Sequence, residues 1–99
     1  MADDAPAPDA PSVSDNAAAG RYEIKVGRRP AVLLYRRRPG VIELVHTRVP
    51  EELSGRGLGA MLARFALEAA RAAGERVVAT CPYVQAYIRK HPEYEALLT

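Results

Sequence analysis

Alternating apolar and polar residues predict β-strands in the part of the chain that follows residue 20. Residues 22–26 alternate cleanly, and residues 31–35 form a second apolar run after turn-type residues at 27–30. A period of two indicates a strand with one buried face, so these two runs predict an antiparallel hairpin. A turn is expected at residues 36–40, and the β-branched residues of 41–49 predict a third strand. Residues 21–49 therefore read as a three-stranded meander.

After residue 57 the period changes from two to 3.6. One stripe of apolar side chains has helical spacing, and Gly74 is well placed to cap its C-terminus. The members of the stripe are Leu58, Met61, Leu62, Phe65 and Ala69. We expect a helix of four to five turns that places Leu62 and Phe65 in the core.

The C-terminal third predicts one more strand and one more helix. Residues 77–81 are a short apolar run, and Pro82, which is favourable in a first helical turn, opens a pattern that ends before His91-Pro92. A strand, a crossover helix and a strand imply parallel pairing of residues 41–49 with 77–81. The predicted fold class is α/β (α+β): a three-stranded antiparallel meander plus one parallel strand, with a crossover helix and a C-terminal helix.

The first twenty residues differ in composition from the rest. They hold four Asp and no basic residue, are rich in Ala and Pro, and offer little large apolar surface besides Val13. Such a segment buries too little surface to offset the entropy of ordering it. We expect residues 1–20 to be a disordered acidic tail and residues 21–99 to be a single domain.

Charge and cysteine content narrow the class of ligand. All 14 Lys and Arg lie in residues 21–99 beside eight of the 12 acids, so the predicted domain carries a net charge of +6. A basic module suits a polyanion, either nucleic acid or a phosphorylated cofactor. The lone Cys81 excludes an intramolecular disulfide and a cysteine-cluster zinc site. Neither a secretory signal nor a membrane-spanning run is found, so we expect a cytoplasmic protein.

Three glycines within five residues, Gly55, Gly57 and Gly59, stand directly before the first predicted helix. Glycines allow close approach of the backbone to a ligand, and the first amides of a helix lack intrahelical partners. Together they favour binding of a pyrophosphate. A dinucleotide-binding fold would need an acidic residue about 20 positions later, where the chain is apolar. A nucleotide-triphosphate loop would end in Gly-Lys-Ser/Thr, which this loop lacks.

At this loop the chain resembles the GNAT superfamily of acetyl-CoA-dependent N-acetyltransferases. Gly57-Leu58-Gly59 match the family's Arg/Gln-x-x-Gly-x-Gly/Ala loop, with Ser54 in place of the first Arg or Gln. The segment from Cys81-Pro82 to His91-Pro92-Glu93-Tyr94, together with His46-Thr47, is similar to the minimal single-domain GNAT family over residues 22–97. Arg48 departs from that family, which often carries an acidic residue there.

The resemblance implies transfer of an acetyl group from acetyl-CoA to an unidentified amine. Coenzyme A is then expected to contact Val49, Ser54, Gly55, Arg56, Gly57, Leu58, Gly59, Ala60, Tyr83 and Tyr87. His46 and Cys81 are the catalytic candidates, expected to share one slot where the parallel strands end. His46 would accept a proton, unless it is only a structural residue on the face of Ile42 and Leu44. Cys81 would be a nucleophile, a contact to the acyl group, or simply a small core residue.

Two other functions remain open from the sequence. A coenzyme A sensor would bind the cofactor without turnover. A basic nucleic-acid module would need aromatic side chains interleaved with Lys and Arg, whereas the meander holds only Tyr22 and Tyr35, which disfavours nucleic acid. No metal ion is expected, and we expect a monomer or a weak dimer.

Overall fold

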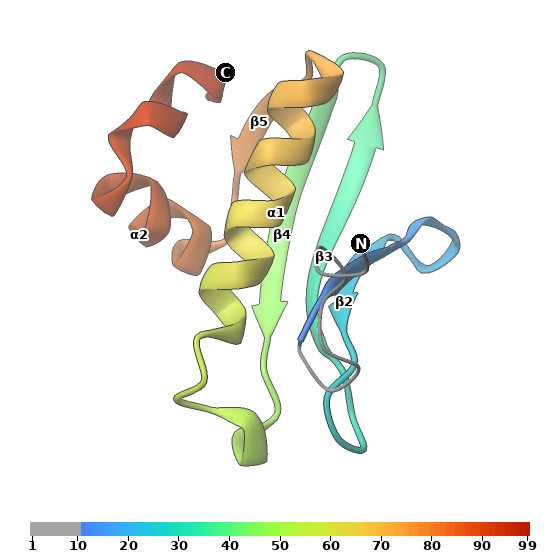
Figure 1. The fold of residues 1–99 in the computed structure, drawn as a ribbon. Helices are drawn as coiled ribbons and strands as arrows, with labels where there is room; N and C mark the ends of the chain where they lie inside the picture. The colour runs from blue at the N-terminus through green and yellow to red at the C-terminus, as the bar shows by residue number, and fades with distance from the viewer. Residues whose placement is uncertain (1–10) are drawn as a thin grey trace, which may run out of the picture.

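The fold is a twisted five-stranded sheet with one long helix across one face and the C-terminal segment beside it (Figure 1). The computed structural model describes residues 11–99. The strands are β1 (Val13–Asn16), β2 (Arg21–Ile24), β3 (Ala31–Arg38), β4 (Val41–Arg48) and β5 (Arg76–Ala79), and they lie in this order. The helices are α1 (Leu58–Ala73) and α2 (Pro82–Lys90). Short 3₁₀ segments occur at Ala17–Ala19, Glu51–Leu53 and Pro92–Leu97.

The predicted arrangement of strands is confirmed. β2, β3 and β4 form the antiparallel meander, and β5 pairs in parallel with β4, from Val41↔Arg76 to Leu44↔Ala79. β3 is longer than expected, because Arg36, Arg37 and Arg38 continue the strand and the turn is confined to Pro39 and Gly40. Gly40 adopts a positive φ of 76°, which glycine tolerates without steric cost.

Part of the segment expected to be disordered is an edge strand. β1 pairs with β2 from Val13↔Ile24 to Asn16↔Arg21. Its side chains add polar contacts: Tyr35 donates a hydrogen bond to Asp15 at 2.6 Å, and Asn16 donates to Glu23 at 3.0 Å. The expectation of disorder is therefore wrong for Val13–Ala19, and residues 1–10 lie outside the described part of the chain.

Within residues 11–99, one apolar cluster fills the space between the sheet and α1. The fully buried positions of α1 include three alanines, so the helix lies close to the strands; the buried set is Leu58, Gly59, Leu62, Ala63, Ala66, Leu67 and Ala70. Leu62 is in the core as predicted, but Phe65 is 40% exposed and packs edge-on against Tyr22. The prediction for Phe65 is wrong because the buried stripe is centred on the alanines and Leu67.

A β-bulge interrupts the register between β3 and β4. Leu34 pairs with His46 and Tyr35 pairs with Leu44, so Val45 has no partner on β3. Beyond an extra residue in a strand, the alternation is reversed, so side chains that would have faced one side of the sheet face the other. Ile42 and Leu44 lie in the core, as does the β3 residue Leu33, whose partner beyond the bulge is Thr47.

The C-terminal residues lie along the outer edge of β5. Thr99 donates its backbone N–H to the carbonyl of Val77 at 3.1 Å, and Leu98 forms an isolated parallel bridge to Val77. Tyr94 is buried and donates a hydrogen bond to Glu68 of α1. Within residues 11–99, the helices are all too short or too polar to cross a membrane.

Candidate functional site

The glycine loop joins the end of β4 to the first turn of α1. After the short 3₁₀ segment, Gly55 and Gly57 adopt positive φ values of 81° and 75°. Gly57 is the N-cap of α1, and a Cβ added there would meet no atom within 4 Å. The loop therefore turns sharply at two glycines and leaves open space in front of the first amides of α1.

A cavity of about 350 Å³ lies at this loop. It is lined by Val49, Leu53, Ser54, Gly55, Gly57, Leu58, Gly59 and Tyr83. Seven of these eight residues were expected to contact coenzyme A from the sequence. Leu53 also lines the cavity, although the sequence did not predict it as a contact to coenzyme A. It is buried, and the only signal for this in the sequence was an apolar residue between Glu52 and Ser54.

Tyr83 lies directly on the start of α1. A Cβ at Gly59 would come within 2.8 Å of the Tyr83 ring carbon Cζ, so the absence of a side chain at residue 59 allows this contact. Tyr83 is 45% exposed and also lines a second cavity of about 280 Å³. The residues around the second cavity are Ala60, Tyr83, Ala86, Tyr87, Lys90 and His91. The two cavities are thus neighbours that share the Tyr83 ring.

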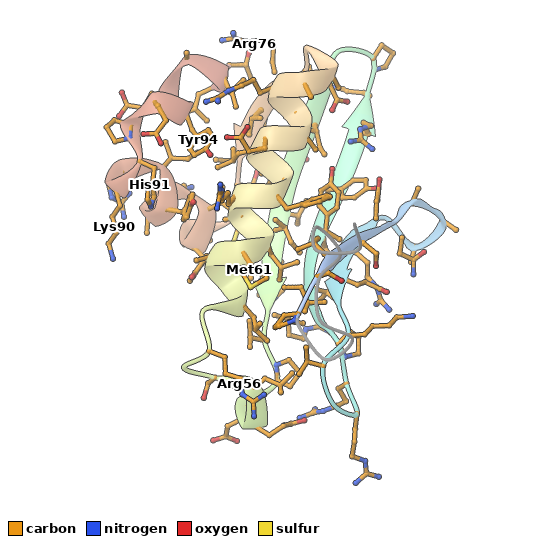
Figure 2. The ribbon with its side chains drawn as sticks, in the orientation of Figure 1. Arg56, Met61, Arg76, Lys90, His91 and Tyr94 are labelled. Atoms are coloured by element: carbon orange, nitrogen blue, oxygen red, sulfur yellow. The ribbon has the colours of Figure 1, made fainter. Side chains whose placement is uncertain are left out.

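The second cavity has an aromatic wall and cationic surroundings. Tyr87 and His91 stack with ring centroids 4.2 Å apart and an interplanar angle of 28°. Figure 2 shows Lys90 and His91 together at the end of α2, away from the meander strands. Ala60 and Tyr87, both expected at the cofactor, lie here rather than at the glycine loop. Arg56 lines neither cavity and is exposed on the loop (Figure 2).

Cys81 lies where β4 and β5 separate. The strand ladder ends at Leu44 and Ala79, and the Cys81 N–H donates one further bond to the Leu44 carbonyl at 2.9 Å. Cys81 is then the N-cap of α2, is 2% exposed, and its Sγ lies 3.3 Å from Thr47 Oγ1. Among the described residues, β4 has no strand partner on this side beyond Leu44.

The environment of Cys81 favours its thiolate. Burial by itself raises the pKa of the thiol. The hydroxyl of Thr47 and the backbone amides of Val84, Tyr83 and Thr47 outweigh that effect and bring the pKa below its usual value. This balance is typical of a thiol at a helix N-terminus.

His46 and Cys81 do not share one slot. His46 is exposed and lies on the sheet face opposite to Thr47, the residue that contacts Cys81. The expectation that His46 shares a face with Ile42 and Leu44 is wrong because the unpaired Val45 reverses the alternation. The sequence did not single out Thr47 as a site residue, although it follows His46 in the segment that is similar to the family. Among residues 11–99, no three His, Cys, Asp or Glu side chains are grouped closely enough to hold a metal ion.

Comparison with known proteins agrees with this geometry. Residues 21–97 match the family described as GCN5-related N-acetyl-transferase. Protein NATD1 of Gallus gallus and of Homo sapiens are each 36% identical to the chain over 63 residues, 63% of this chain. The matched region spans only 57% and 56% of the length of those two relatives.

A solution NMR structure of a GCN5-like protein from Staphylococcus aureus shares the fold. Its TM-score is 0.69 at 23% identity, with 89% of this chain and 87% of that chain covered. The sheet with a parallel β4–β5 pair, the glycine loop before α1 and the match over residues 21–97 lead to the same result. The chain belongs to the GCN5-related N-acetyltransferase family.

Proposed function

We propose that this protein transfers an acetyl group from acetyl-CoA to an amine. The observation that carries the proposal is the cavity at the glycine loop, which opens onto the first amides of α1 beside the point where β4 and β5 separate. A helix N-terminus with unpartnered amides is a favourable place for a pyrophosphate. The net charge of +6 on residues 21–99 favours the same polyanionic cofactor.

The residues present fit coenzyme A. A Cβ at Gly55 or Gly57 would project into space that is empty of protein atoms, so these positions leave room for phosphate oxygens. The amides of residues 56–60 would hold the pyrophosphate. The cavity shared by Tyr83, Tyr87 and His91 would hold the adjoining part of the nucleotide, close to Lys90. Coenzyme A supplies the acetyl group as a reactive thioester.

The chain's own groups would handle the protons and the developing charge. Backbone N–H groups of β4 beyond Leu44, which lack a β5 partner among the described residues, would stabilise negative charge on the acyl oxygen. Cys81, held by Thr47, would contact the acyl group from the cofactor side or act as a nucleophile. His46, on the opposite face of β4, would accept the proton of the incoming amine.

Thiol release is the direct test of this function. Acetyl-CoA is incubated with a panel of polyamines, amino acids, peptides and basic proteins, and free thiol is measured. An acetyltransferase releases thiol over many turnovers only with its acceptor present, although a Cys81 nucleophile would free one equivalent of coenzyme A without it, whereas a protein that merely senses coenzyme A binds it without release. A Cys81 nucleophile would also give an acetylated chain by mass spectrometry when no acceptor is present.

The position of the cofactor is tested separately by calorimetry. Gly57→Val should abolish coenzyme A binding by filling the open space, but the positive φ at residue 57 strains any side chain there. Ser54→Glu is therefore the second variant, since Ser54 is exposed at the cavity and a carboxylate would repel the pyrophosphate. Unchanged affinity for coenzyme A in folded Ser54→Glu would exclude the glycine loop as the pyrophosphate site.

The alternative of nucleic-acid binding is not supported by the meander. Tyr22 and Tyr35 are 1% and 8% exposed and lie in the core, so neither ring is available for stacking on a base.

A further inference from the structure

The sheet face opposite α1 carries a third cavity, of about 480 Å³. Its lining residues are Arg21, Arg29, Pro30, Val32, Arg48, Val49, Pro50 and Glu51. Val49 also lines the cavity at the glycine loop. The two cavities therefore meet at the end of β4, one on each side of the strand.

Strand register places the polar residues of this face in two neighbouring rows. One row runs Glu23↔Val32↔Arg48 across β2, β3 and β4, and the next runs Arg21↔Leu34↔His46. Paired positions on neighbouring strands lie about 5 Å apart, and successive rows lie about 7 Å apart. His46, Arg48 and Arg21 thus surround the same patch of sheet.

Two buried side chains support this cavity: Val32 lines it, and Glu23 is paired with Val32 on the neighbouring strand. Val32 is 3% exposed, yet it does not belong to the cluster beneath α1. Glu23, also 3% exposed, accepts hydrogen bonds from Asn16 and from Arg21 Nε at 2.6 Å. These two bonds hold the pKa of the Glu23 carboxyl below its usual value, so Glu23 stays charged and fixes Arg21 from one side.

The charged side chains around this cavity differ in whether they already have an ion-pair partner. Arg29 is engaged by Glu52 at 2.8 Å, and Arg21 uses its Nε for Glu23. Arg48 and Glu51 form no ion pair with another residue of the described chain. A guanidinium with unused donors is the side chain best suited to grip a carboxylate, and the nearby Glu51 suits an ammonium group.

We propose that this cavity is the acceptor site and that it takes a small amine whose molecule also carries a carboxylate. Arg48, assisted by the free nitrogens of Arg21, holds the carboxylate, and the amine lies toward His46 and the end of β4. This inference rests on the proposed acetyl transfer. It adds that the acceptor amine enters from the sheet face opposite α1. The volume is large enough to admit a molecule of amino-acid size.

Matched amines test the carboxylate. Thiol release is measured with γ-aminobutyrate against butylamine, in which a methyl group replaces the carboxylate, and with lysine against cadaverine, in which a hydrogen atom replaces it. The carboxylate-bearing amine should have the higher kcat/KM in both pairs. Arg48→Gln should lower that value by about 10- to 100-fold for the carboxylate-bearing amines and so remove most of the preference, because a charged hydrogen-bonding partner is lost.

Arg38→Gln is the matched control, since Arg38 is exposed on β3 and lines none of the three cavities. It should leave the preference intact. The inference is overturned if butylamine and cadaverine react as well as their partners, or if the preference for a carboxylate survives in Arg48→Gln. In either case thiol release itself would still support acetyl transfer.

A binding measurement separates failure of this site from failure of the chemistry. Protein saturated with coenzyme A is titrated with γ-aminobutyrate and followed by NMR of its backbone amides. Shifts concentrated at Arg21, Val32 and Arg48 support the site even if no amine releases thiol. Absence of shifts on this face overturns the site, whatever the outcome of the thiol assay.

Discussion

Thr47 and His46 are adjacent in sequence but lie on opposite faces of β4. Thr47 contacts the buried thiol of Cys81 at 3.3 Å, whereas His46 is exposed beside Arg48. The cofactor side and the acceptor side of the proposed reaction are thus separated by the thickness of one strand. The amine and the acetyl group would therefore have to meet beyond Leu44, where the β4–β5 ladder ends.

The Thr47 hydroxyl should control the acidity of Cys81. Thr47→Val removes one of the groups that stabilise the thiolate, so the pKa of Cys81 should rise toward that of a free thiol. Thiolate absorbance measured across a pH series reports this value. Thr80→Val is the control, because the hydroxyl of Thr80 donates to Glu43 and not to the sulfur. A pKa that falls or stays constant in Thr47→Val would contradict the assignment.

At the scale of elements, β1 shows how a weakly apolar segment becomes a strand. Only Val13 packs against the core, and the remaining contacts are the ladder to β2 and the bonds Tyr35–Asp15 and Asn16–Glu23. Residues 13–16 have no apolar alternation, because the strand is held by its ladder to β2 and by polar side-chain bonds and not by a row of buried apolar residues. Sequence periodicity therefore could not find this strand.

Removal of residues 1–20 should destabilise the domain, contrary to the expectation from sequence. The truncation exposes the edge of β2 and leaves Glu23 without its bond from Asn16. Each kcal/mol lost should lower the melting temperature by about 4–8 °C in a domain of this size. Removal of residues 1–10 alone, which retains β1, is the comparison. Equal melting temperatures for the two truncated proteins would mean that β1 contributes nothing to stability.

Alkaline pH should weaken the attachment of β1. Burial and the hydrogen bond to Asp15 raise the pKa of Tyr35 to about 12 from the usual 10.0. A raised pKa in an acidic group means that the folded state favours the neutral phenol, so this stability is complete below pH 10 and is lost as the pH rises toward 12. Urea denaturation at a series of pH values would show the loss. Tyr35→Phe should show a shallower decline, and an identical pH dependence would argue against the bond.

The whole molecule depends on one small core, and α1 supplies much of it. The fold class, the parallel β4–β5 pair and the helix limits were predictable because they follow from local periodicity and from the handedness of the crossover. The rotation of α1 about its axis was harder to predict, because helical spacing alone does not show that the alanines are buried and Phe65 is exposed. The position of His46 was unpredictable, because a bulge is a property of the register between two strands.

Leu62 and Phe65 should differ sharply in their effect on stability. Leu62 is fully buried, so Leu62→Ala should cost about 2–5 kcal/mol of unfolding free energy, and added coenzyme A should restore part of it if the cofactor binds the folded state. Phe65→Ala should cost less, because its ring is 40% exposed. Chemical denaturation of the two variants decides the matter. A larger loss in Phe65→Ala would show that its contact with Tyr22 outweighs burial.

The C-terminal residues that lie along β5 also limit how copies of the protein can join. Leu98 and Thr99 occupy the outer edge of that strand at Val77, whereas within residues 11–99 no element pairs with the outer edge of β1. A sheet with two free edges can polymerise without end, but a sheet with one can add a single neighbour and stop. For the part of the chain that the structure describes, edge-to-edge pairing of two copies through β1 would therefore end in a closed pair, and growth at the other edge would first require Leu98 and Thr99 to leave β5.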